Sequence, residues 1–302
     1  MKSPAVRHRA DLCPGVLRPW PAEDGALVRL RLVGGRVEPD ALVGLLRVAE
    51  SHGDGTVHLT KRANLQLRGL PADGDCLAPE LVEEIAATGL LPFPSHELVR
   101  NIMVSPLSGL DSPLARDLQS PGDSESRARG RADLRPVARE LDEGLCAHPS
   151  LAALPGRFLF VLDDGRGDLL DRSLDLGLVA VSSSECQLRM GTRAWGPVVP
   201  LEEAAGRLVG LARAFITVRG EGPTAAWHVD ELPARTDDHP RDPRIEVPNA
   251  PPPYGVVAPG VAHVTVPDGV LTREQLDDLL ADEPDHLVVT PWRSVVVVDR
   301  VV

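Results

Sequence analysis

One short stretch of the chain carries many hydrogen-bond donors on what reads as a strand. Residues 57–70 are VHLTKRANLQLRGL, and the apolar residues among them indicate a β-strand. The polar positions are long donors with almost no acceptors among them: Lys61, Arg62, Asn64, Gln66 and Arg68. Taken alone, this pattern is typical of an edge strand whose charges only prevent aggregation. The alternative is a surface that binds an anionic ligand, because guanidinium groups match the geometry of carboxylates.

Two later segments add candidate side chains. PSHELVRNIMVSPLSG supplies His96, Arg100 and Asn101, and LPGRFLFVLDDGRGD supplies Arg157. His96 is a weak catalytic candidate, because the unperturbed pKa of histidine lies near neutrality, and a local hydrogen-bonding role is the alternative. The acidic turn of the second segment suggests either a divalent cation or a simple Asp-Gly turn, through Asp163, Asp164 and Asp168. The turn is preferred, and no metal site is predicted.

The composition limits the classes of partner. With 302 residues, of which 43% are hydrophobic, the chain can bury a large core and is expected to form two or three domains. The net charge of −12 and the pI of about 5.2 argue against a general nucleic-acid or anionic-membrane binder, which needs a positive field. Any anion-binding site must therefore be local.

The sequence also predicts the cellular location and the state of the cysteines. No stretch approaches the roughly 20 apolar residues of a spanning helix, and the first residues lack the apolar core of a signal peptide. We therefore expect a cytoplasmic protein. The four cysteines lie at least 40 residues apart in the sequence and are expected to be buried free thiols: Cys13, Cys76, Cys146 and Cys186.

The chain reads as an alternation of strands and helices. Residues 25–70 predict a strand, a helix and a strand, and PELVEEIAATGL predicts a helix that stops at Gly89. Helices over residues 134–147 and 201–218 flank further predicted strands. Residues 111–133 are polar and predict a mobile loop, whereas seven prolines between residues 230 and 253 predict an exposed linker.

The opening pattern returns after the linker. If Val37 is laid on Leu271, the three helical leucines of the first unit fall on leucines of the second without gaps: Leu42, Leu45 and Leu46 on Leu276, Leu279 and Leu280. Removing four residues before the last strand also sets Thr60 opposite Thr290. An internal duplication explains this match.

Four segments in order resemble one protein family. They are CPGVLRPWPAEDGALVRLRL, LTKRANLQLRGL, LLPFPSHELVRNIMVSPLSGLD and LPGRFLFVLDDGRGDL. They are similar to the sulfite/nitrite reductase superfamily, above all to its precorrin-3B synthase branch, over residues 11–302. The resemblance implies an α+β fold in which duplicated ferredoxin-like half-domains surround an α/β reductase-type domain.

The resemblance also implies domain boundaries and site residues. The expected parts are a ferredoxin-like half-domain (1–92), the α/β domain (93–229), the linker (230–254) and a second half-domain (255–302). In the family, a Thr-x-Arg-x-x-x-Gln strand contributes to the tetrapyrrole site. The residues that match it or lie beside the expected macrocycle are Thr60, Arg62, Asn64, Gln66, Arg68, Arg100, Asn101 and Arg157. We expect Arg62, Gln66 and Arg100 to converge on one cleft, without acidic partners and with Arg157 at the rim.

The cofactor expectation departs from the family. Family members hold a 4Fe–4S cluster on cysteine pairs of a fourth module, and the reductases also bind siroheme. This sequence ends at Val302, where that module is expected, and its cysteines do not have cluster spacing. We therefore expect no cofactor bound by this chain alone, and a separate chain that carries the cluster module is a possible partner.

Three functions follow from these observations. The first is a precorrin-3B synthase-like protein of cobalamin biosynthesis, which binds a polycarboxylate tetrapyrrole of the precorrin-3A type for oxygen-dependent hydroxylation and lactone formation. The second is a siroheme-type reductase component, which the single basic residue Arg157 disfavours because small anions need concentrated positive charge. The third is a non-catalytic tetrapyrrole-binding protein. Whether the chain is an enzyme by itself is left open.

Overall fold

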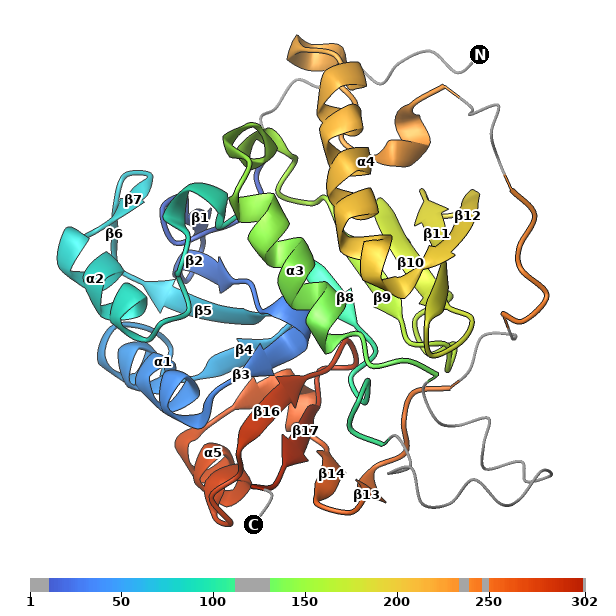
Figure 1. Cartoon of the computed structure of the whole chain (residues 1–302). Helices are drawn as coiled ribbons and strands as arrows, with labels where there is room; N and C mark the ends of the chain where they lie inside the picture. Colours follow the sequence, from blue (N-terminus) through green and yellow to red (C-terminus); the bar gives the residue numbers. More distant parts are fainter. Residues whose placement is uncertain (1–10, 112–130, 234–238, 246–249, 301–302) are drawn as a thin grey trace.

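The computed structural model describes residues 11–111, 131–233, 239–245 and 250–300. Figure 1 shows a first half-domain with α1 and α2, a central α/β region with α3 and α4, and a second half-domain with α5 next to the first. The expected mixture of α-helices and several β-sheets is confirmed. The exact domain boundaries remain predictions.

The first half-domain is a sheet covered by two helices. Its elements are β1 (Trp20–Ala22), β2 (Gly25–Leu30), the short 3₁₀ helix η1 (Val33–Gly35), β3 (Arg36–Val37), α1 (Pro39–His52), β4 (Val57–Leu59), β5 (Leu65–Leu70), β6 (Ala72–Asp73), β7 (Cys76–Leu77), α2 (Pro79–Ala87) and η2 (Pro94–His96). Both α-helices begin with proline, whose fixed φ suits the first turn. Gly89 follows α2 with φ +79°, the left-handed geometry that ends many helices.

The α/β domain is a five-stranded sheet with α3 and α4 on one face (Figure 1). Its elements are β8 (Ile102–Val104), α3 (Arg135–Cys146), η4 (Pro149–Ala153), β9 (Phe160–Asp163), β10 (Leu176–Ala180), β11 (Glu185–Met190), β12 (Trp195–Pro200), η5 (Leu201–Glu203), α4 (Ala204–Val218), η6 (Gly222–Thr224) and η7 (Val229–Glu231). The strand order is β12-β11-β10-β9-β8, and β8, β9 and β10 are parallel. Phe160 and Leu162 enter the helical core, whereas Val161 between them lies in a small apolar cluster with Trp292.

The second half-domain repeats the first in a shorter form. Its elements are β13 (Gly255–Ala258), β14 (Val261–Val264), η8 (Pro267–Gly269), β15 (Val270–Leu271), α5 (Arg273–Leu280), β16 (His286–Val289) and β17 (Val295–Val298). A capping box between Thr272 and Gln275 begins α5, because each side chain bonds a free backbone N–H of the other.

The two halves exchange short strands. β15 of the second half pairs with β4 of the first, and β3 of the first half pairs with β16 of the second. The registers correspond, with Leu271 opposite Val57 and Val37 opposite Leu287. Each sheet therefore has five strands, and the two half-domains share one hydrophobic core. This reciprocal pairing confirms the expected duplication. The two sheets do not merge into one: each remains a separate five-stranded sheet that includes one strand of the other half.

A turn of the same geometry follows β4 and β16. Thr60 N donates to Asn64 O at 2.9 Å, and Thr290 N donates to Ser294 O at 2.9 Å. The fourth residue of each five-residue turn has a positive φ angle: Ala63 at +55° and Arg293 at +60°. The equivalence of Thr60 and Thr290 expected from the sequence is therefore confirmed at the level of backbone hydrogen bonds.

Two expected loops are only partly described. The mobile loop predicted for residues 111–133 falls mainly on residues 112–130, which lie outside the described residues. The described parts of residues 230–254 contain no β-strand, in agreement with a linker. No helix in the described parts of the chain is long and apolar enough to cross a membrane.

A buried histidine attaches the end of the linker to the second half-domain. His263 is 1% exposed, its Nδ1 lies 3.0 Å from Pro252 O, and its Nε2 lies 2.7 Å from Ser294 Oγ. A carbonyl accepts only, so Nδ1 carries a proton. Burial lowers the pKa of His263 and so favours the neutral ring, in which Nε2 accepts from the serine hydroxyl.

The neutral ring predicts a loss of stability in mild acid. Because the folded pKa lies below the unfolded value of 6.5, the unfolded chain takes up a proton first, and the contribution of His263 declines as pH falls below that value. We expect urea unfolding free energies to drop less between pH 7 and 5.5 in His263→Asn, which keeps a donor near Nδ1, than in the wild type. Equal pH slopes in the two proteins would contradict a buried neutral His263.

Candidate functional site

The face of the first sheet that points away from its helices is polar. Val28 and Leu65 enter the core, so their strand neighbours Arg29 and Gln66 lie on the opposite face. These two residues are cross-strand partners, and Arg29 Nη2 donates to Gln66 Oε1 at 3.2 Å. Arg29 Nε is buried and has no acceptor among the described residues. This face therefore holds a donor that an additional acceptor would satisfy.

The turn between β4 and β5 directs Arg62 toward the α/β domain. Thr60 Oγ1 accepts hydrogen bonds from the backbone N–H groups of Arg62 and Asn64, at 3.3 and 3.1 Å, and so fixes the turn. Arg62 Nη1 donates to the backbone carbonyl of Arg157 at 3.0 Å. Because a carbonyl orients the guanidinium without neutralising it, Arg62 has no ion-pair partner among the described residues, although the charges of Asp175 and Asp11 act on it.

Four arginines form the candidate site, which we call the arginine cluster: Arg29, Arg31, Arg62 and Arg157. Burial lowers the pKa of Arg31 to about 10, and the charge of Arg29 contributes to this shift. Burial also lowers the pKa of Arg62, and the charge of Arg157 adds to this. None of the four forms an ion pair within the described residues. Such a cluster in an acidic chain attracts anions locally.

Asn64 and Asn101 were expected beside the ligand, but both side chains lie inside the protein and bond to protein groups. Both are at most 2% exposed. Asn64 Oδ1 accepts from Leu32 N at 2.9 Å, and Asn101 Oδ1 accepts from Arg31 Nε at 3.1 Å and from Asn64 Nδ2 at 3.4 Å. Asn101 Nδ2 donates to Gly156 O at 2.9 Å. The two amides thus connect the first half-domain to the α/β domain and hold Arg31 in place.

The expectation that Arg100 lacks an acidic partner is wrong, and the further candidate Arg68 also has one. Arg68 Nε lies 3.1 Å from Asp24 Oδ2 near the surface. Arg100 donates through Nε and Nη2 to both oxygens of Asp142, at 2.6 and 2.8 Å, and both residues are at most 9% exposed. Asp142 lies on α3, 42 positions further along the chain. The ion pair forms only because α3 packs against the segment that contains Arg100, so the sequence did not predict it.

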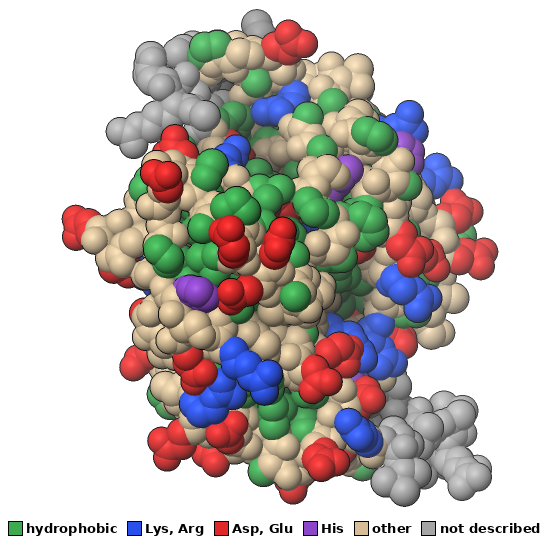
Figure 2. Space-filling model, turned by 90° about the vertical axis from the view of Figure 1, so that its left-hand side faces the viewer, with side chains coloured by type: hydrophobic (Ala, Val, Ile, Leu, Met, Phe, Trp, Pro, Cys, Tyr) green, Lys and Arg blue, Asp and Glu red, His purple; other side chains and the backbone are tan. Residues whose placement is uncertain are grey.

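Arg100 lines a groove that Arg62 and Gln66 do not reach. The groove has a volume of about 870 Å³ between the first half-domain and α3, and both α1 and α3 begin on its wall. Four of its arginines, Arg36, Arg100, Arg135 and Arg139, are paired with an acid, whereas Arg31, which also lines the groove, has no ion pair among the described residues. Figure 2, which looks onto the side of α1 and α2, shows basic and acidic side chains interspersed rather than gathered by sign. The expected convergence of Arg62, Gln66 and Arg100 is therefore not met in this groove.

His96 is held by local hydrogen bonds. The residue is 4% exposed, its Nδ1 lies 2.9 Å from Ser95 Oγ, and its Nε2 lies 3.3 Å from His148 O. Both ring nitrogens are thus occupied within the protein. The geometry supports the local role rather than proton transfer to a ligand.

The sequence reasoning did not identify Arg29, Arg31 or Asp175. The alternation Arg-Leu-Arg-Leu in residues 29–32 is a signal for the two arginines, because residues two apart lie on one face of a strand. Asp175 had no such signal. It accepts from Leu159 N and Val229 N, at 2.9 Å each, and burial raises its pKa to about 6 against the opposing charges of His228 and Arg62. Asp175 is therefore an additional ionisable group near the arginine cluster.

The equivalent face of the second half-domain is largely apolar and also holds the buried His263. The duplication places His263, Val296 and Trp292 at the positions of Arg29, Gln66 and Arg62. Val288 and Val296 pack with Leu107 in a buried cluster, so this face is covered. Trp292 packs against the sheet of the α/β domain, where Arg172 lies over its ring. Only the first half-domain therefore presents a cationic face among the described residues.

The cysteines of this chain do not fit a 4Fe–4S cluster. Cys13 lies on the segment before β1, Cys76 on β7, Cys146 at the end of α3, and Cys186 is buried in β11. Within the described residues, the group of three or more potential metal ligands consists of aspartates and includes no cysteine. Because such a cluster needs convergent thiolates, these residues do not supply its ligands.

Comparison with known proteins agrees with this fold. Residues 20–87 match the nitrite/sulfite reductase ferredoxin-like half domain. The chain is 32% identical over 182 residues to precorrin-3B synthase of Sinorhizobium sp., which covers 58% of this chain and 33% of that protein. It is 28% identical over 155 residues to ferredoxin–nitrite reductase of Synechococcus elongatus, which covers 49% of this chain and 27% of that protein. The chain thus matches about a third or less of the length of these relatives.

A solved structure shows the same architecture over nearly the whole chain. The NirA protein of Mycobacterium tuberculosis superposes with a TM-score of 0.60 at 17% identity, over 98% of this chain and 58% of that one. The likeness confirms the expected fold. The half-domain match over residues 20–87 and the similarity to a precorrin-3B synthase support the resemblance to the sulfite/nitrite reductase superfamily and to its precorrin-3B synthase branch.

Proposed function

We propose that the chain binds a polycarboxylate tetrapyrrole as part of a precorrin-3B synthase-like protein of cobalamin biosynthesis. The observation that carries the proposal is the difference between the two half-domains: one sheet face holds the arginine cluster, and its duplicate is largely apolar and covered. A ligand with several carboxylates suits several guanidinium groups, because charge-assisted hydrogen bonds are about twice as strong as neutral ones. Arg29, Arg62 and Arg157 are the proposed ligand contacts, and Asn101, which is bonded to Asn64, holds the neighbouring Arg31.

The proposed reaction needs groups beyond the arginine cluster. Oxygen-dependent hydroxylation and lactone formation on a precorrin-3A type substrate would use a 4Fe–4S cluster, as the family resemblance implies. Since the four cysteines of this chain do not fit that cluster, its ligands would come from a further segment or from a partner chain. Within this proposal the 302 residues bind and orient the substrate, and the location is cytoplasmic.

Titration with sirohydrochlorin tests the proposal. We expect Arg62→Ala and Arg29→Ala to weaken binding about 10- to 150-fold each, because each loses a charge-assisted contact worth about 1.5–3 kcal/mol. The matched control is Arg47→Ala, which removes an exposed arginine from α1 in the same half-domain and should leave the affinity unchanged. Equal affinity of all four proteins, or no binding by the wild type, would contradict the proposal.

A siroheme-type reductase component is the second candidate, because the chain is similar to a ferredoxin–nitrite reductase. Siroheme carries peripheral carboxylates as well, so the arginine cluster fits either ligand. The two candidates differ in the iron: a reductase component saturated with siroheme and its missing module would show haem-like absorption and reduce nitrite or sulfite. Binding of the metal-free macrocycle without such activity favours the first candidate.

A further inference from the structure

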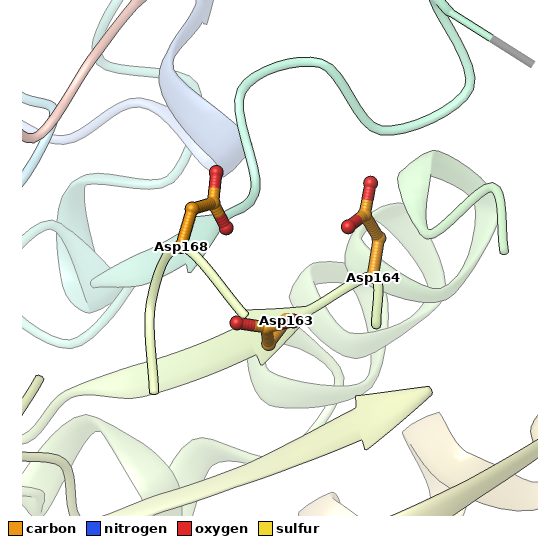
Figure 3. A group of neighbouring side chains, drawn as sticks. All are labelled: Asp163, Asp164 and Asp168. Carbon is orange, nitrogen blue, oxygen red and sulfur yellow. The ribbon is translucent and has the colours of Figure 1, made fainter. Parts of the chain in front are cut away.

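A buried group of carboxylates lies at the carboxyl end of the parallel strands. Asp163 is the last residue of β9, Asp164 follows it, and Ser105 follows β8, the parallel neighbour of β9. Figure 3 shows the side chains of Asp163, Asp164 and Asp168 around a common space at the end of a strand. Carboxylate oxygens of the three residues lie within 4.8 Å of one another. Open α/β sheets commonly bind ligands at this edge.

The three carboxylates differ in their hydrogen bonds. Asp163 accepts three backbone N–H groups of its own loop, at 2.9 to 3.0 Å. Asp164 accepts from the guanidinium of Arg166 through both oxygens. Asp168 accepts from Ser105 Oγ at 2.7 Å through Oδ1, but its buried Oδ2 has no hydrogen-bond partner among the described residues. Since Asp168 is 8% exposed, water does not replace the missing partner freely.

The charges around this group are only partly balanced by neighbouring arginines, because Arg189 interacts with the charge of Asp163 but forms no ion pair with it among the described residues. The guanidinium of Arg166 forms ion pairs with both Asp164 and Asp111, so it does not neutralise Asp164 alone. Arg172 lies over the Trp292 ring and, within the described parts of the chain, forms no ion pair with the three carboxylates. Burial raises the pKa of Asp168 well above its ordinary value, and the charges of Asp163 and Asp164 raise it further. A buried carboxylate of this kind needs either a proton or a cation.

The geometry points to a binding site for one hard divalent cation of the size of calcium, held by Asp163, Asp164 and Asp168. Ca²⁺ takes carboxylate oxygens at about 2.3–2.6 Å, so oxygens on opposite sides of the ion lie up to about 5 Å apart, which accommodates the observed separations. Mg²⁺ demands a near-ideal octahedral arrangement, which three carboxylates held by other hydrogen bonds supply less readily than the flexible geometry that Ca²⁺ accepts. Each carboxylate offers about four lone-pair positions, so Asp163 and Asp164 can keep their present hydrogen bonds while they coordinate.

Calcium titration of the chelator-treated full chain tests this site. We expect isothermal calorimetry to show one Ca²⁺ per chain with a Kd of about 1 mM or below, and weaker binding of Mg²⁺. At a Ca²⁺ concentration about 100 times the Kd, the thermal midpoint should rise by roughly 5 °C. Asp168→Asn should lower the calcium affinity at least about 10-fold. Among the three carboxylates, only that of Asp168 has an oxygen without a hydrogen-bond partner in the described residues, and the substitution removes this carboxylate.

The matched control is Asp171→Asn, which changes an exposed aspartate three positions away in the same loop. This variant should bind calcium like the wild type. The site is excluded if the wild type shows neither heat nor a thermal shift at about 10 mM Ca²⁺, on the order of ten times the weakest Kd expected. It is also excluded if Asp168→Asn, shown by circular dichroism to be folded, responds to Ca²⁺ as the wild type does. A stability of the metal-free wild type that falls with rising pH, together with no calcium binding, would instead assign a proton to Asp168.

Discussion

Gly35→Ala is expected to destabilise the protein by about 3 kcal/mol or more. Gly35 has φ +77°, and a Cβ atom there would lie 2.1 Å from the backbone oxygen of Val289. Val289 ends β16, the strand that receives β3 in the reciprocal exchange. The methyl group would therefore force apart the backbones that join the two half-domains, and this clash adds to the cost of positive φ.

Substitutions at two other glycines distinguish the cost of the steric clash from the cost of the positive φ angle. Gly55 has φ +80°, and a methyl group added there would meet no atom within 4 Å, so Gly55→Ala should cost only about 1–2 kcal/mol. Gly269 is the counterpart of Gly35 in the second half, and its Cβ would lie 2.8 Å from the Cβ of Arg293, a less severe overlap than the one with the backbone oxygen of Val289. Urea unfolding should rank the losses as Gly35, Gly269 and Gly55 in decreasing order. Equal losses would mean that the exchange contact near Val289 is not tight.

Arg100→Ala is expected to reduce the free energy of unfolding by about 3–5 kcal/mol. The substitution leaves the carboxylate of Asp142 buried without its bidentate partner. The double variant Arg100→Leu with Asp142→Leu should be more stable than Arg100→Ala, because neither charge remains in the interior. Urea unfolding of the single and double variants measures the coupling between the two residues.

The control for this prediction is Arg135→Ala at the other end of the groove. Arg135 pairs with Asp133, but both side chains are about half exposed, so their ion pair should contribute about 0–1 kcal/mol. If Arg100→Ala costs no more than Arg135→Ala, the pair with Asp142 is not a stabilising contact. Arg100→Ala that folds normally but loses tetrapyrrole affinity would restore Arg100 as a ligand contact.

The sequence by itself determined the elements and their repetition. Leucine spacing predicted α1 and α5, and the alignment of Val37 with Leu271 predicted that the two units share one topology. The polar character of the first strand pair was visible in residues 57–70. These features are local, because the periods of 3.6 and 2 residues arise within one element and do not depend on its neighbours.

The exchange of strands was decided only by the tertiary structure. β3 and β15 are two residues long, too short for a periodic signal, and each pairs with a strand of the other half-domain. The duplication predicted that the sheets join, but it did not say which strand crosses. That choice depends on backbone hydrogen bonds between segments about 200 positions or more apart, which no local pattern encodes.

The partners of the candidate site residues were likewise a matter of packing. Arg62 and Arg100 look alike in the sequence, yet Arg62 is held by a carbonyl 95 positions away, whereas Arg100 is neutralised by Asp142. Asn64 and Asn101 were predicted as donors to a ligand, and the fold brings their amides together in its interior. The sequence specifies which side chains carry charge and hydrogen-bonding groups. Whether a charged side chain faces a ligand or a buried counter-ion depends on which elements come into contact. A hydrogen bond or ion pair within the protein replaces the contact with water only where the two groups are close together and buried.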